Sequence, residues 1–186
     1  MKVFSYCAQS LADSMQQIAG DGAPLTCPPL DASSFEAGWL EGYDLLLFDL
    51  HGAPQDAHWY GDMNLPALSA ETLLKARLNG TVVFALNCFL AEEGSPMLDA
   101  LLTAGASFVV AGDGPNYAGV ETVFGAGSLA RWFRRFLGQG ISAPRSLWLA
   151  RRAIQPEMII SGRRVATRDA SLFRAFTRTA PKIMAA

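Results

Sequence analysis

Three short apolar runs, separated by helical segments, constrain the fold of this chain more than any other feature. They are residues 44–50 (DLLLFDL), 81–87 (TVVFALN) and 106–111 (ASFVVA). Each run is almost continuously apolar, as a strand must be when helices cover both faces of its sheet. A helix between two strands is the usual crossover that makes them parallel. The sequence therefore predicts an α/β fold in three layers, with helices on both sides of a mostly parallel sheet.

The N-terminal part of the chain fits the same architecture. Residues 2–7 (KVFSYC) predict a first strand, and apolar residues then recur with a 3.6-residue period over 8–19, which predicts a helix. Residues 25–26 are expected to form a short edge strand, closed by two prolines. Residues 31–42 are expected to be a loop or short helix, and residues 53–66 are rich in turn formers and are expected to be loop.

Capping signals and periodicity predict the remaining helices. Ser69 is the expected N-cap of a helix over 71–78, and Pro96 is expected to open another that ends at Gly105. Residues 112–127 are glycine-rich and are expected to be loop. Further helices are predicted over 129–137, over 146–154 and near 171–179. No segment is long enough to separate two domains, so residues 1–186 are expected to form one domain.

Composition excludes several classes of protein. Hydrophobic residues make up 51% of the 186 residues and charged residues 17%, which excludes an intrinsically disordered chain. We find no run of about 18 apolar residues that would predict a transmembrane helix, and the N-terminus lacks a secretory signal pattern. Three cysteines without a repeated spacing predict neither disulfides nor a metal site, and favour a cytoplasmic location. No phosphate-binding motif is present, so no cofactor is expected.

Charge is divided unevenly along the chain. The first 130 residues hold 3 Lys/Arg and 15 Asp/Glu, whereas residues 131–186 hold 12 and 2, which gives net charges of −12 and +10. Such a division is explained most simply by two oppositely charged parts of one fold that attract each other. It would also serve to attract a cationic substrate or an anionic partner. The arginines lie in helices with an apolar face, so we expect no nucleic-acid binding.

Two chemically reactive residues directly follow two of the predicted strands. His51 comes after residues 44–50, and Cys88 comes after residues 81–87. Because adjacent parallel strands lie about 4.8 Å apart and end at the same edge of a sheet, we expect these side chains to face each other. An imidazole can take the proton of a thiol and so create a nucleophile for a carbonyl group. Gly52 and the Cys88 amide are the expected donors to the oxyanion.

Each of the two reactive residues also has a simpler explanation. A single cysteine is most often a small buried apolar residue, and a single histidine at a strand end is most often a hydrogen-bonded surface group. The combination is more specific than either residue alone, since both directly follow apolar strands in the order strand–His–Gly, crossover, strand–Cys.

This order resembles that of the caspase-like cysteine peptidases, a group that includes gingipains, separases and CHAT domains. LLLFDLHG (45–52) and VVFALNC (82–88) are similar to the two segments that carry the histidine and the cysteine of that group. Residues 98–112 and 128–154 look most like the corresponding parts of CHAT domains. The resemblance implies a caspase-like fold with flavodoxin-like strand order. It also implies a cysteine endopeptidase with a Cys88–His51 dyad.

Three further residues are candidates for contacts with a peptide substrate. Asp113 follows the third apolar run, near the position of an acidic specificity residue in the resemblance, and could pair with a basic side chain at P1, the substrate residue before the cleaved bond. Asn87 stands before Cys88, where CHAT domains usually have alanine. His58 lies in the loop after His51 and could line the cleft. An Asp beside a glycine is also a common turn former, which is the simpler explanation of Asp113.

Two other functions compete with a peptidase. A catalytically inactive scaffold of the same fold would act through a protein partner. A flavodoxin-like module would bind a small ligand, but the segment after its first strand, residues 7–10 (CAQS), has no glycine to cradle a phosphate. The expected partners are a peptide or protein substrate and, for the scaffold, another protein. Neither a membrane nor a nucleic acid is expected, and the oligomeric state stays open.

Overall fold

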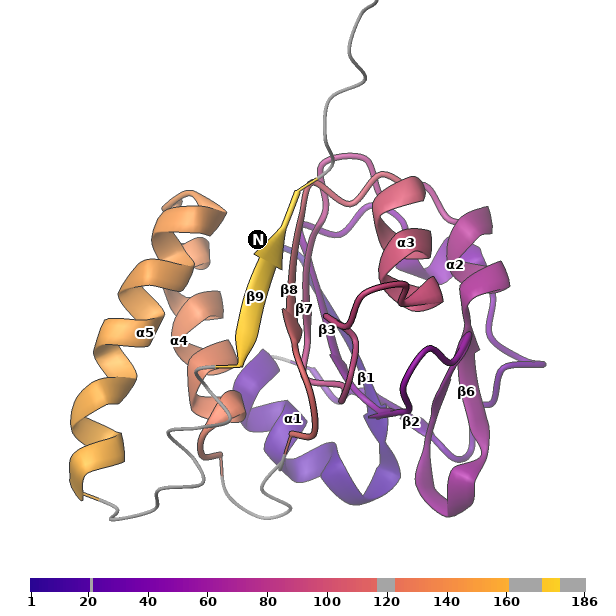
Figure 1. The fold of residues 1–186 in the computed structure, drawn as a ribbon, viewed down its shortest axis with the longest axis horizontal. Coiled ribbons are helices and arrows are strands. Elements are labelled where there is room, and N and C mark those ends of the chain that lie inside the picture. Colours follow the sequence, from indigo (N-terminus) through magenta and orange to yellow (C-terminus); the bar gives the residue numbers. More distant parts are fainter. Residues whose placement is uncertain (21, 117–122, 161–171, 178–186) are drawn as a thin grey trace, which may run out of the picture.

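A six-stranded sheet forms the centre of the computed structural model, which describes residues 1–20, 22–116, 123–160 and 172–177 (Figure 1). Five of its strands are parallel, and the sixth, at one edge, is antiparallel. The strand order is β2-β1-β3-β7-β8-β9, which is the flavodoxin-like order followed by one added strand. In chain order the strands are β1 (Val3–Ala8), β2 (Leu25–Cys27), β3 (Leu45–Asp49), β7 (Val82–Ala85), β8 (Phe108–Gly112) and β9 (Phe173–Phe176).

Helices cover both faces of this sheet, as Figure 1 shows. On one side lie α2 (Ala70–Lys75) and α3 (Pro96–Thr103), and on the other lie α1 (Ala12–Ala19), α4 (Ala126–Gly138) and α5 (Ala143–Ile160). Side chains of β3 alternate between the two apolar cores, since Leu46 and Phe48 face α2 and α3 while Leu45 and Leu47 face α1 and α4. The predicted three-layer α/β fold is confirmed.

Local capping explains where two of the helices begin. The Ser69 hydroxyl accepts a hydrogen bond from the Thr72 N–H at 3.1 Å, so α2 starts where the sequence predicted. The Ser95 hydroxyl accepts one from the Leu98 N–H at 3.4 Å, and Pro96 occupies the first turn of α3. Three short 3₁₀ turns complete the helical elements of the described chain: η1 (Gln9–Leu11), η2 (Ala37–Leu40) and η3 (Asp62–Asn64).

Two sequence predictions about secondary structure are wrong. Residues 173–176 form strand β9 rather than part of a helix, because the free edge of β8 supplies backbone partners that outweigh a short helical pattern. Residues 53–66 are not only loop, since a small antiparallel sheet joins β4 (His51–Gly52), β5 (His58–Tyr60) and β6 (Pro66–Ser69). Of the predicted loop over 112–127, residues 117–122 lie outside the described part.

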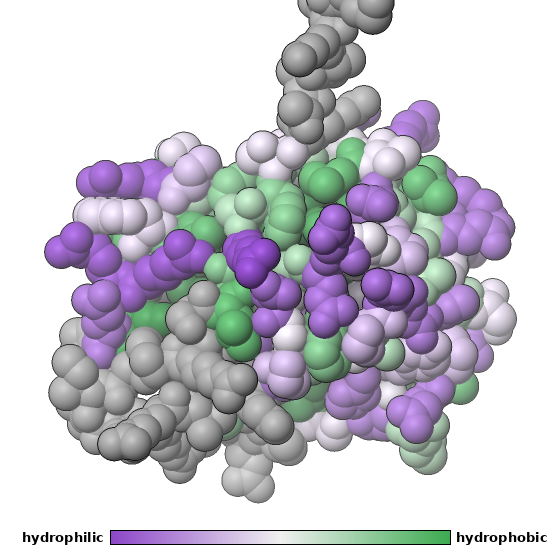
Figure 2. Space-filling view, in the orientation of Figure 1, coloured by the Kyte–Doolittle hydropathy of each residue, from purple (hydrophilic) through white to green (hydrophobic). Residues whose placement is uncertain are grey.

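The basic C-terminal part of the chain belongs to the fold as far as the structure describes it. Leu147, Ala150 and Ile154 of α5 are buried in the core on the α1 and α4 side. In Figure 2, the upper left of the molecule, where α5 is not covered by grey atoms, is mainly hydrophilic. None of the described helices is both long and apolar enough to cross a membrane. Within the described residues, no three His, Cys, Asp or Glu side chains are grouped as metal ligands would be.

Candidate active site

The candidate residues gather at the carboxyl edge of the sheet, as the strand order requires. Strands β3 and β7 are hydrogen-bonded neighbours, with Phe48 opposite Ala85 at their last paired position. β8 lies on the other side of β7. His51, Cys88 and Asp113 therefore all follow strands that end at one edge, and the predicted adjacency of the first two strands is confirmed.

Gly52 lies directly against the backbone of Cys88. A β-carbon built on Gly52 would stand 2.3 Å from the Cys88 carbonyl oxygen, which is closer than real side chains approach backbone atoms. Glycine is required at this position because there is no room for a β-carbon, and not because of an unusual φ angle. The segment that carries His51 and the segment that carries Cys88 are therefore in contact through their backbones.

The Cys88 thiol occupies a sharp turn at the end of the β7 segment. The next residue, Phe89, has a φ of +60°, in the left-handed region that non-glycine residues seldom adopt. Strain of this kind often marks functional sites. The Cys88 sulfur accepts a hydrogen bond from the Asn116 N–H at 3.1 Å and lies 3.5 Å from the Asn116 carbonyl oxygen, to which the thiol can donate.

The other two cysteines are in a different environment. Cys7 and Cys27 are buried, whereas Cys88 is partly exposed. Burial raises the pKa of the Cys7 thiol well above its usual range, and the nearby Asp49 and Asp62 carboxylates raise it further. Burial is also the main cause of a raised pKa at Cys27. Of the three cysteines, Cys88 is therefore the least buried.

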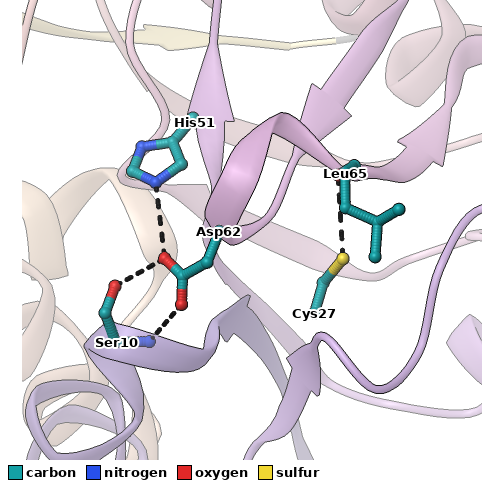
Figure 3. Close-up of polar contacts among 5 residues, drawn as sticks. All are labelled: Ser10, Cys27, His51, Asp62 and Leu65. Atoms are coloured by element: carbon teal, nitrogen blue, oxygen red, sulfur yellow. Dashed lines mark hydrogen bonds and ion pairs between the residues drawn. The ribbon is translucent and has the colours of Figure 1, made fainter.

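The His51 imidazole faces a carboxylate that the sequence analysis did not find. Its side chain is 54% exposed, and Nε2 lies 3.9 Å from Oδ1 of Asp62. Figure 3 shows that His51 and Ser10 approach the same Asp62 carboxylate. The Ser10 hydroxyl and N–H each donate to it at 2.7 Å, which fixes its orientation. Asp62 is in η3, in a stretch that composition alone marked as loop, so no signal in the sequence paired it with His51.

The turn that carries Asp62 is fixed from the other side by Cys27. The Cys27 thiol lies 3.7 Å from the Leu65 carbonyl oxygen, just after η3 (Figure 3). A β-carbon on Gly61, the residue before Asp62, would stand 2.5 Å from the Cys27 sulfur. This buried cysteine therefore has a packing role beneath the turn.

The three predicted substrate contacts have different surroundings. Asp113 forms an ion pair with Arg174 of β9, and its side chain is 26% exposed. Asn87 is fully buried, and its Oδ1 accepts a hydrogen bond from the Leu50 N–H at 3.3 Å, so it ties the β7 end to the β3 end. His58 pairs with Asp56, with Nδ1 3.5 Å from Oδ1. Asn87 and His58 thus each have a partner other than the His51 and Cys88 side chains.

One further carboxyl group lies beneath this edge of the sheet. Asp49, the last residue of β3, is buried on the face covered by α1 and α4 and stands opposite Cys7 of β1. Burial raises its pKa to about 7. Asp49 is therefore an acid whose charge depends on pH near neutrality, two residues before His51.

Comparison with known proteins supports the fold. No protein-family model and no curated protein matches the sequence. Among solved structures, the chain is similar to the Arg-specific cysteine proteinase gingipain R, with 10% identity and a TM-score of 0.56 over 95% of this chain and 46% of that chain. It is also similar to separase in the Saccharomyces cerevisiae separase–securin complex, with 12% identity and a TM-score of 0.55 over 95% of this chain and 12% of that chain. The fold is caspase-like.

These likenesses concern architecture alone, because the sequence identities are low. A flavodoxin from Bacillus cereus aligns over 75% of this chain, with 14% identity and a TM-score of 0.44. The chain spans less than half of the gingipain chain and a small part of the separase chain. A caspase-like fold does not by itself make any residue catalytic, so each candidate residue has to be judged from its own surroundings.

Proposed function

We propose that this caspase-like chain is a cysteine peptidase in which Cys88 is the nucleophile and His51 the base. The observation that carries the proposal is the backbone contact between Gly52 and Cys88. Because Gly52 directly follows His51, this contact brings the histidine segment against the cysteine segment. The partial exposure of Cys88 and the exposure of His51 also support it, since both groups have to meet a substrate.

The proposed reaction proceeds by acyl transfer. The Cys88 sulfur attacks the substrate carbonyl carbon, and its proton passes to His51, which then gives a proton to the departing amine. Water hydrolyses the resulting thioester, releases the carboxylate and restores the thiol. The N–H groups of Gly52 and Cys88 are the proposed donors to the oxyanion of each tetrahedral intermediate. No metal or cofactor takes part in this scheme.

Asp62 has a positioning role in this proposal. Its carboxylate faces Nε2 of His51, so Nδ1 is the nitrogen that would exchange a proton with Cys88. A carboxylate on the far side of the ring stabilises the imidazolium that forms during attack. The two Ser10 hydrogen bonds hold that carboxylate in place.

A preference for a basic P1 residue is the finer part of the proposal. Asp113 supports it, since the carboxylate already pairs with a guanidinium, that of Arg174. A substrate arginine would have to displace Arg174. Asp113→Asn should therefore reduce kcat/KM for peptides with Arg or Lys at P1 and leave peptides with other P1 residues unchanged. The closer likeness to CHAT domains and a cytoplasmic location stay predictions.

The test is hydrolysis of a peptide library together with alkylation of Cys88. Purified chain, Cys88→Ala and His51→Ala are assayed for cleavage, and the rate of iodoacetamide labelling at Cys88 is followed from pH 5 to pH 10. We expect cleavage to be lost in both variants and labelling near pH 7 to slow in His51→Ala. His58→Ala, which alters the other histidine, should leave the rate of Cys88 labelling unchanged.

A folded chain that cleaves no peptide, and whose Cys88 labelling does not change in His51→Ala, would overturn the proposal. Of the two competing functions, the catalytically inactive scaffold would then be favoured over the small-ligand module, because residues 7–10 have no glycine to cradle a phosphate. Such a scaffold would act by binding a protein partner, and that binding would not require the Cys88 thiol.

A further inference from the structure

Asn116 is the residue that the structure places on the Cys88 sulfur. Its N–H lies 3.1 Å from Sγ and its carbonyl oxygen lies 3.5 Å from the same atom. The contact with the N–H persists when the Cys88 thiol loses its proton. The contact with the carbonyl oxygen requires that proton, because the thiol is the donor. An N–H aimed at the sulfur interacts more strongly with the thiolate than with the thiol, because the negative charge strengthens the hydrogen bond.

The side chain of Asn116 fastens the same loop to the end of the β7 segment. Its Nδ2 donates to the carbonyl oxygens of Leu86 and Asn87, at 3.0 and 3.3 Å. These are the two residues directly before Cys88. One residue thus holds the backbone that carries the thiol and donates an N–H to the sulfur.

Space for this carboxamide depends on a glycine in β8. A β-carbon on Gly112 would stand 2.4 Å from the Asn116 Nδ2. The residues after Cys88 are attached to the same region, since the Phe89 N–H donates to Gly114 and the Ala91 N–H donates to Gly112, each at 2.9 Å. The thiol-bearing turn is therefore held on both sides by residues 112–116.

The Asn116 carboxamide also occupies a position that lowers the stability of the fold. Its Oδ1 is buried without a hydrogen-bond partner in the described part of the chain. A buried amide oxygen without a partner is destabilising, and such groups in a native structure call for an explanation other than stability. The two Nδ2 hydrogen bonds beside the reactive thiol provide one.

We propose that Asn116 is a positioning residue that activates Cys88: its carboxamide anchors the loop so that its own N–H stays on the sulfur and favours the thiolate. This inference rests on the proposed function for its biological meaning. Its physical content is independent, because it concerns the ionisation of Cys88 and not the cleavage of a peptide.

The experiment measures the pH midpoint of iodoacetamide labelling at Cys88, read by peptide mapping without any substrate. Asn116→Ala removes the carboxamide anchor. Gly112→Ala leaves Asn116 in place but forces its Nδ2 away from the two carbonyl groups. We expect each variant to raise the midpoint by about half a pH unit or more, which slows labelling at neutral pH about threefold. The double variant should shift no further than the single ones, because both act on one anchor.

Gln16→Ala, which removes an exposed carboxamide on α1, and Gly38→Ala, whose β-carbon meets no atom within 4 Å, are the matched controls. A cooperative thermal unfolding transition establishes that each variant is folded. If Asn116→Ala does not fold, the labelling midpoint of Gly112→Ala tests the inference. Unchanged midpoints in the folded variants overturn the inference. Failure of the proposed function has a different signature, namely no cleavage and no effect of His51→Ala, with the Asn116 shift intact.

Discussion

The α-carbon of Gly52 lies so close to the Cys88 carbonyl oxygen that a β-carbon would be 2.3 Å from it, which leaves no room for any other residue. The oxygen belongs to backbone and has no flexible side chain with which to yield. Relief of the clash requires the two strand ends to separate.

Gly52→Ala is therefore expected to destabilise the fold by about 1–3 kcal/mol, as overpacking usually does. It should also abolish peptide cleavage, because the separation moves His51 away from Cys88. Urea unfolding and the peptide assay check the two effects. The matched control is Gly38→Ala, for which stability should stay the same within about 0.5 kcal/mol. An active Gly52→Ala variant would contradict the role given to this contact.

Asp62→Asn should slow peptide cleavage tenfold or more while the fold remains intact. The neutral amide no longer stabilises an imidazolium at His51, although it retains an oxygen for Ser10. The measurement is kcat, with unfolding followed by circular dichroism. Asp56→Asn is the matched control, since Asp56 pairs with the second histidine, His58. Equal rates for the two variants would show that the carboxylate beside His51 is not used.

Brief iodoacetamide treatment at pH 7.5 should label Cys88 and spare Cys7 and Cys27. The two spared thiols are buried and their pKa values are raised, so neither access nor ionisation favours reaction. Peptide mapping by mass spectrometry identifies the labelled residue. In urea all three should react. Labelling of Cys7 or Cys27 in the folded chain at the rate of Cys88 is the contrary outcome.

The parallel part of the sheet could be predicted because each apolar run has the length and composition of a strand that is buried on both faces. Residues 44–50 and 81–87 have no polar face, so only a strand covered on both sides accommodates them. The helical segment between these two runs is the usual crossover that makes two strands parallel. His51 and Cys88 directly follow these two runs, and the pairing of β3 with β7 confirms that the two strands are neighbours.

The remainder depends on contacts between distant residues, and the sequence holds no sign of them. Phe173 and Phe176 have the spacing of a helix, and only the open edge of β8 makes them a strand. Asp62 and Asn116 are single polar residues in turns. Their approach to His51 and Cys88 results from how those turns fold back over the edge of the sheet.

Asp49→Asn should make the stability of the protein less sensitive to pH. The folded-state pKa of this buried carboxyl is raised to about 7 from an ordinary value of 3.8, so the folded protein prefers the protonated form. The stability that this preference contributes is fully present below about pH 4 and is lost as pH rises through 7. The loss in the wild-type chain is on the order of 4 kcal/mol, and the asparagine variant avoids it because it has no proton to release.

Urea unfolding at pH 5 and pH 8.5 measures this difference. The wild-type chain should lose more stability between the two values than Asp49→Asn, and the variant should be the more stable protein at pH 8.5. Glu93→Gln, at an exposed position, is the control and should follow the wild-type curve. Parallel curves for wild type and Asp49→Asn would mean that Asp49 does not take up its proton on folding, and that its burial is relieved by water or by movement of β3.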